Sequence, residues 1–275
     1  MVHFICALKC EAKSLIEFYR LKKSAKSASF PLFISQDKQT SLTISGIGKI
    51  NAAAATAFTH AFLQTGKADI WLNIGIAGHR ELEIGEITLA HKIIDQSTQY
   101  TWYPQIIFSP HCQSMKILSC DKPVMDYESA VLSATVFEME AAGFYATACR
   151  FATSELIHVV KIISDNQLHP ADKISESFVG NLIKNKLSSI DQILESLRLL
   201  AKDLETSNEM PIYYDQIIKK WRFTHAQRNL LKSCLNRWHI LCPDENPMDE
   251  LDGSSHRKDV LHKITNKLDL ITICY

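Results

Sequence analysis

The chain has 275 residues, 46% of them hydrophobic, which suffices for one large α/β domain or for a domain with an appendage. Thirty Lys and Arg residues balance thirty Asp and Glu residues, which argues against a nucleic-acid-binding surface. No apolar run approaches the roughly 20 residues of a membrane span. These properties favour a small-molecule ligand, with no nucleic acid or membrane as partner.

The eight cysteines contain no C-x-x-C pair, and several lie within apolar runs, as reduced core thiols do. The apolar run at the N-terminus is interrupted by Lys9, so it does not have the pattern of a secretory signal. Both observations favour a cytoplasmic protein.

Short apolar runs rich in β-branched or aromatic residues alternate with helical patterns, which predicts a mainly parallel, buried sheet in an α/β fold. The first strand is followed by a helix that carries Glu11 in its first turn. The expected strands are 4–8, 41–45, 69–73, 86–94, 115–118 and 157–163. The expected helices after the first are 50–65, 141–151 and a long one at 176–200.

From residue 201 the strand-helix alternation stops, so we divide the chain into a domain at 1–200 and a mostly helical extension at 201–275. The sequence from Thr224 to Gln227 has the form of a capping box that opens a helix. Residues 244–258 are polar and contain proline and glycine, which predicts a mobile loop. Trp221 and Trp238 either seal the extension onto the main domain or form a partner surface.

Six of the nine glycines fall between residues 46 and 85. Gly46 and Gly48 follow one expected strand, and Gly75 and Gly78 follow another. Glycine permits close approach of the backbone to a ligand, so both segments are candidate ligand-contact turns, with tight turns that bind nothing as the alternative. Neither segment fits a nucleotide-binding fingerprint.

Acidic residues occur at the ends of three expected strands that are far apart in the sequence. Glu11 follows the first strand, Glu138 and Glu140 bracket Met139 before an alanine-rich helix, and Asp165 follows Ser164 after the last strand. Taken singly, Glu11 is typical of a first-turn acid and Ser164-Asp165 of a helix N-cap. Together they indicate a site that cleaves a polar, hydroxyl-rich molecule.

Short stretches in a fixed order across residues 1–195 resemble the purine nucleoside phosphorylase/uridine phosphorylase superfamily, and most nearly the 5'-methylthioadenosine/S-adenosylhomocysteine nucleosidases. The resemblance implies a three-layer α/β/α sandwich around a twisted, mixed, partly barrel-like sheet, usually in a homodimer. The helical extension lies outside it. No cofactor or metal ion is expected. The matching stretches are 7–11, 45–52, 73–78, 85–87, 137–142 and 163–165.

The resemblance implies hydrolysis of a purine nucleoside to the free base. Glu11 matches the general base that activates water, and Asp165 matches the acid that protonates N7 of the purine. Glu140 matches the carboxylate that binds the ribose hydroxyls. The resemblance also places at the substrate Met139, which packs on the sugar, together with Glu138, Ser164, Ala77 and Gly78.

The sequence departs from those nucleosidases at two positions near the attacking water. Ile76 stands where a serine is common, and Lys161 stands where an arginine is common. Lysine retains the charge but not the planar fork of arginine. The segment 96–134 is also shorter than in that family, and residues 119–124 take the place of the wall that faces the base, with Val124 as an expected base contact.

Two other functions stay open. A phosphorylase needs arginines to hold phosphate, and the first arginine is Arg20, without a Gly-x-Pro-x-Arg element. Hydrolysis is therefore favoured over phosphorolysis. The substitutions at Ile76 and Lys161, with the extra 75 residues, also fit a nucleoside-binding regulatory module that has lost catalysis.

Overall fold

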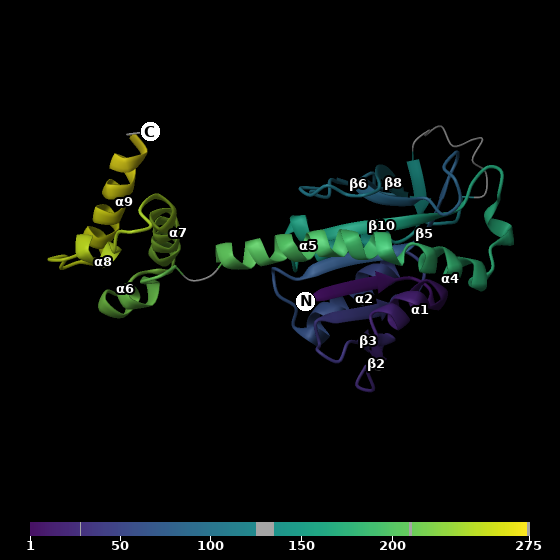
Figure 1. Ribbon diagram of the computed structural model, residues 1–275, viewed down its shortest axis with the longest axis horizontal. Helices are drawn as coiled ribbons and strands as arrows, with labels where there is room; N and C mark the ends of the chain where they lie inside the picture. Colours follow the sequence, from purple (N-terminus) through teal and green to yellow (C-terminus); the bar gives the residue numbers. More distant parts are fainter. Residues whose placement is uncertain (28, 125–134, 209–210, 274–275) are drawn as a thin grey trace. The chain divides into compact units, whose positions relative to one another are not determined.

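The computed structural model describes residues 1–27, 29–124, 135–208 and 211–273 (Figure 1). The part of the 96–134 segment between 125 and 134 lies outside the described residues. The chain forms two compact units, Met1–Glu205 and Thr206–Tyr275. The first unit extends past residue 200 because its last helix continues without a break to Asn208.

The first unit contains a ten-stranded sheet in the described part of the chain. Strand β5 pairs with both β9 and β10, so that β5, β10, β6, β8 and β9 form a closed ring, and β1, β4, β3 and β2 extend from it. Parallel and antiparallel pairs both occur, which confirms the expected mixed, partly barrel-like sheet. The strands are β1 (Val2–Cys6), β2 (Lys22–Lys23), β3 (Leu32–Ile34), β4 (Thr40–Ile44), β5 (Ile70–His79), β6 (Ile87–Asp95), β7 (Thr101–Trp102), β8 (Gln113–Ser119), β9 (Thr135–Glu138) and β10 (Ile157–Asp165).

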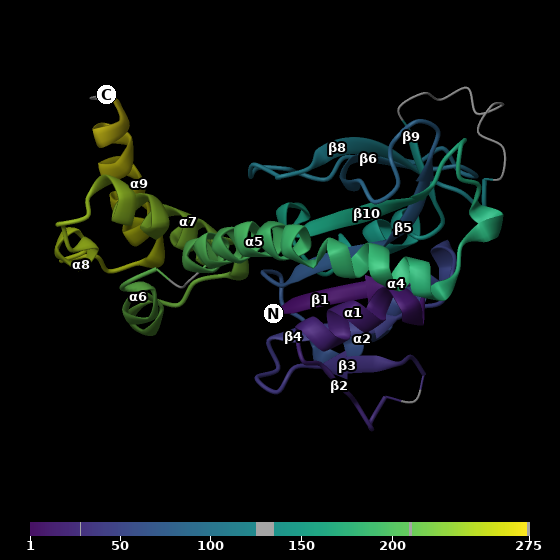
Figure 2. The same ribbon diagram turned by 45° about the vertical axis from the view of Figure 1, so that its right-hand side comes forward.

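Helices cover both faces of this sheet, as Figure 2 shows, and each face has its own hydrophobic core. Helices α1 (Lys9–Phe18), α4 (Glu176–Asn185) and α5 (Leu187–Asn208) pack on one face. Helices α2 (Lys49–Leu63) and α3 (Ala141–Ala148) pack on the other. The three-layer α/β/α sandwich is therefore confirmed.

Three local predictions were wrong. The single helix expected at 176–200 is two helices, because α4 ends at Asn185 with Lys186 as its C-cap, and α5 begins at Leu187. The segment from Gly75 to Gly78 is not a turn, since β5 continues through it with ladder pairing to β10. The loop expected at 244–258 contains the short helix α8 (Pro247–Glu250), and α9 (Arg257–Ile273) begins before its end.

The second unit is helical and has its own core, built around α6 (Tyr214–Lys220), α7 (His225–Leu241) and α9. Trp221 and Trp238 are buried in this core, and their indole N–H groups donate to the carbonyl oxygens of Ser254 and Glu245. The capping box at Thr224 is present and opens α7 as predicted. No helix in the described part of the chain is long and apolar enough to cross a membrane.

Candidate active site

A cavity of about 180 Å³ lies in the first unit where β5, β9 and β10 end and where α1 begins. It brings together the predicted acids Glu11, Glu140 and Asp165. The other predicted site residues on its wall are Ile76, Ala77, Gly78, Val124, Glu138, Met139 and Ser164. Lys161 is the exception, because it does not line the cavity.

Glu11 is held in place by two backbone N–H groups. Its Oε2 accepts from Leu8 at 2.8 Å, and its Oε1 accepts from Ile76 at 2.9 Å. The side chain is buried, and burial raises the pKa of the carboxyl above its ordinary value, opposed by the Lys161 ammonium. Residue 76 therefore contacts Glu11 through its backbone, a bond that isoleucine makes as well as serine does.

Gly75 makes room for the Glu11 carboxylate beside β5. A Cβ atom at position 75 would lie 2.7 Å from Glu11 Oε1, closer than non-bonded atoms approach. We expect Gly75→Ala to displace the carboxylate from its N–H donors, with a cost in stability of about 1–3 kcal/mol. The rate of base release should also fall, because the displaced Glu11 carboxylate no longer faces the attacking water. Denaturant unfolding and turnover check this, with Gly66→Ala as the control, since a Cβ there has its nearest contact at 4.0 Å. Unchanged unfolding and turnover in Gly75→Ala would contradict it.

Lys161 is a buried residue of β10, and its ammonium lies beside two of the acids that line the cavity. Its Nζ is 2.9 Å from Glu138 Oε2 and 3.5 Å from Glu140 Oε2. Burial alone would lower the pKa of Lys161, but the nearby carboxylates outweigh burial and raise it, so the ammonium stays charged. Its observed position fits a charge partner for the acids.

Glu138 is committed to contacts within the protein. Its Oε1 accepts from the Ser119 hydroxyl at 2.5 Å, and its Oε2 accepts from the backbone N–H groups of Glu140 and Ala141 as well as from Lys161. These backbone groups form the N-terminus of α3, which favours a negative charge. Glu138 thus fixes the start of α3, and the neighbouring Glu140 with it.

Glu140 has one oxygen at the N-terminus of α2. Its Oε1 accepts from the Gly48 N–H at 2.9 Å, and Gly48 has a φ of 101°, a conformation that favours glycine. The turn predicted at Gly46 and Gly48 is therefore present between β4 and α2. Burial raises the pKa of Glu140, with Lys161 opposing this and the Glu138 charge adding to it.

Asp165 is the last residue of β10 and is 6% exposed. Its Oδ1 accepts from the Ser164 hydroxyl at 2.5 Å, and the same hydroxyl lies 3.3 Å from the Ala77 carbonyl oxygen. The β10–β5 register shifts between Ile163 and Asp165, where Asp165 pairs with Gly78. This irregularity places the carboxyl at the end of the strand, on the cavity wall.

Sequence reasoning missed several residues of this site. Ala171 and Ile174 line the cavity from the segment that follows Asp165. In the sequence, Pro170 marks a loop there but does not indicate a ligand contact. Ser119 was seen as part of the wall but not as the partner of Glu138. Gly48 was identified as a turn residue without its bond to Glu140.

A scan against protein-family models finds no match, and neither does a search of curated proteins. Solved structures do match. Futalosine hydrolase of Helicobacter pylori is similar with a TM-score of 0.59 at 15% identity, over 70% of this chain and 97% of that one. The Arabidopsis thaliana 5'-methylthioadenosine nucleosidase has a TM-score of 0.57 at 15% identity, over 71% of this chain and 95% of the other. A 5'-methylthioadenosine/S-adenosylhomocysteine nucleosidase from S. pneumoniae has a TM-score of 0.57 at 18% identity, over 71% and 99%.

These similarities show the fold. The chain shares the fold of these solved hydrolase and nucleosidase structures, in agreement with the fold that the sequence resemblance implied, while the identities are too low to transfer a substrate.

Proposed function

We propose that the first unit hydrolyses the N-glycosidic bond of a purine nucleoside of the 5'-methylthioadenosine or S-adenosylhomocysteine type and releases the free base. The observation that carries this proposal is the meeting of Glu11, Glu140 and Asp165 in one cavity. Each comes from a different part of the chain, and each has a buried carboxyl group. The fold shared with solved nucleosidases adds support.

The chemistry assigns each carboxyl group a separate task. Cleavage of a ribosyl C–N bond builds positive charge on the sugar and negative charge on the departing base. Asp165 protonates N7, so that the base leaves neutral, and Glu11 takes a proton from the water that attacks C1 of the sugar. Glu140 accepts hydrogen bonds from the ribose hydroxyls, and Met139 packs against the sugar.

Hydrolysis is favoured over phosphorolysis by the residues around the cavity. A phosphate dianion calls for arginine or several cations, but within the described residues the lining contains no arginine, and Lys122 is its only cation. The Lys161 ammonium is engaged by carboxylates. A water nucleophile needs none of these charges.

A panel of purine nucleosides tests the proposal, with free base measured by chromatography in the presence and absence of phosphate. We expect base release in phosphate-free buffer. An absolute requirement for phosphate would establish phosphorolysis instead. Binding without any base release would establish the alternative of a regulatory module, which the isoleucine at position 76 motivates.

We further propose that the protein is a cytoplasmic homodimer. Several large apolar side chains of the first unit are exposed, including Ile50 at 85%, Tyr100 at 69% and Ile107 at 59%. Contiguous exposed apolar surface marks protein interfaces, and we propose that a homodimer covers these side chains. Light scattering measures the mass in solution, and a monomer at micromolar concentration would contradict the assembly.

A further inference from the structure

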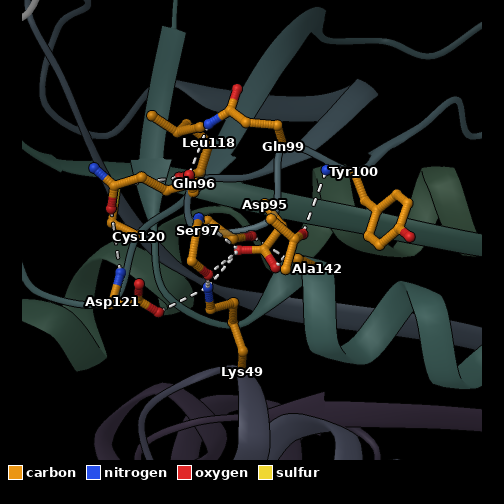
Figure 3. A network of polar contacts seen from close by, with 12 residues as sticks. Lys49, Asp95, Gln96, Ser97, Gln99, Tyr100, Leu118, Cys120, Asp121 and Ala142 are labelled. Carbon is orange, nitrogen blue, oxygen red and sulfur yellow. Dashed lines mark hydrogen bonds and ion pairs between the residues drawn. The ribbon is translucent and has the colours of Figure 1, made fainter.

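Lys49 joins three parts of the first unit beside the cavity, although it does not line the cavity itself. It is the first residue of α2 and follows Gly48, whose N–H binds Glu140. Figure 3 shows its ammonium pointing between two carboxylates, Asp95 and Asp121. Its Nζ contacts Asp95 Oδ1, lies 2.7 Å from Asp121 Oδ1 and donates to the Ser97 hydroxyl at 2.9 Å.

The root of the Lys49 side chain is fixed by close packing of α2 against α3. A Cβ atom at Gly143 would lie 2.0 Å from the Lys49 carbonyl oxygen, so the two helix backbones touch there. Only glycine at position 143 permits this approach. The ammonium therefore projects from a backbone that has no room to shift toward α3.

Asp95 is the anchored partner of Lys49. It is the last residue of β6, and its side chain is 13% exposed. Its Oδ1 also accepts from the Ser97 N–H and hydroxyl, and its Oδ2 accepts from the Thr98 hydroxyl at 2.8 Å. Asp95 is thus held by its own turn, as Figure 3 shows for Ser97.

Asp121 is the exposed partner, since its side chain is 57% exposed. It belongs to the wall segment, which we define as residues 119–124, and Cys120, Lys122, Pro123 and Val124 of this segment line the cavity. Its backbone N–H donates to Gln96 Oε1 at 3.4 Å, a long bond. The Lys49–Asp121 ion pair is therefore a short polar tether immediately before the cavity-lining residues 122–124.

We propose that Lys49 is a positioning residue for ligand binding, which ties the wall segment to β6 while its neighbour Gly48 holds Glu140. Ser119 and Cys120 are also held by the pairing of β8 with β6 and by bonds to Glu138. Lys49 therefore fixes the part of the wall that begins at Asp121, and its neighbour fixes the ribose-binding carboxylate. The inference rests on the proposed function for the identity of the ligand.

Loss of the ammonium leaves two carboxylates facing each other. Asp95 is anchored and Asp121 is solvent-accessible, so Asp121 moves into water and carries the wall segment with it. We expect Lys49→Met to raise KM for the nucleoside about tenfold, the value of one charge-assisted hydrogen bond, with kcat changed less than about threefold. Lys49→Arg should recover most of the lost affinity, because it keeps the charge.

The experiment compares Lys49→Met, Lys49→Arg and Asp121→Asn with Lys67→Met as the matched control. Lys67 is exposed, and in the described part of the chain its ammonium donates to the Arg150 carbonyl and forms no ion pair. Steady-state kinetics separate KM from kcat, and hydrogen exchange of the peptide spanning 115–124 reports on the wall. If Lys49 and Asp121 act through their mutual ion pair, the KM of the double variant Lys49→Met/Asp121→Asn is no higher than that of Lys49→Met alone.

Faster hydrogen exchange in the wall segment of Lys49→Met, together with a raised KM of that variant, supports the proposal. A loss in kcat at unchanged KM, or unchanged exchange in the wall, overturns it. The affinity for free adenine is measured in parallel by calorimetry, which tests the role of Lys49 even if the wild-type protein releases no base. Absence of base release from the wild type would reject the proposed function but not the role of Lys49.

Discussion

Replacing Asp165 with asparagine is expected to lower base release from a purine nucleoside by a factor of about 10²–10⁴. Asparagine has the same shape and still accepts the hydrogen bond that Ser164 donates to Asp165, but it has no carboxyl proton for N7. Ligand binding should therefore change little. Single-turnover release measured by chromatography, with calorimetric binding of the same nucleoside, checks both parts.

The leaving group offers a sharper test of Asp165. The leaving group of a nitrophenyl riboside is nitrophenolate, a stable anion that needs no protonation. Asp165→Asn should therefore cleave this substrate nearly as fast as the wild type does. Asp37→Asn is the matched control, since Asp37 also accepts a serine hydroxyl but lies on the surface. Equal losses on both substrates would show that Asp165 is not the acid.

Replacing Glu11 with glutamine is expected to cost a similar factor of about 10²–10⁴, for a different reason. The amide cannot take a proton from water, and its NH₂ group cannot accept the second of the two backbone N–H bonds that fix Glu11. Glu11→Gln should therefore be slow on the nitrophenyl riboside as well. Glu17→Gln on the exposed side of α1 is the control. Nitrophenyl activity close to that of the wild type would exclude Glu11 as the base.

The pH dependence of kcat/KM reports on the same group. Glu11 acts only when ionised, and burial raises the pKa of its carboxyl. Activity is therefore present above that raised pKa and is lost as the pH falls through it, at a higher pH than for an exposed glutamate. Glu11→Gln should lack this acidic limb, and a limb that persists in the variant would assign it to another residue.

The sequence predicted the layers of the fold because each strand and helix carries its own local pattern. The alternating apolar runs indicated the buried strands, and the motif order indicated the mixed sheet. The order of the acids along the chain also predicted that Glu11, Glu140 and Asp165 belong to one site. Their chemical roles remain predictions.

Other features depend on contacts that no local pattern contains. The sequence alone suggests that Gly75 is a turn residue, but β5 continues through it. The glycine is needed there because a side chain at position 75 would occupy the place of the Glu11 carboxylate. Lys161 sits in an apolar run whose neighbours do not show that two glutamates face it. The partners of Lys49 are 46 and 72 positions away, so only the folded chain brings them together.

The source of the oxygen atom in the sugar product tests the central claim most directly. The protein is incubated with a purine nucleoside in phosphate-free buffer made with ¹⁸O-labelled water, and the ribose and the free base are analysed by mass spectrometry. If water is the nucleophile, one labelled oxygen appears at C1 of the freshly released sugar, faster than free ribose exchanges its own C1 oxygen with the labelled water, and the base is unlabelled. Intact nucleoside after prolonged incubation with the wild-type protein, at concentrations where binding is measured, would contradict hydrolysis at this site.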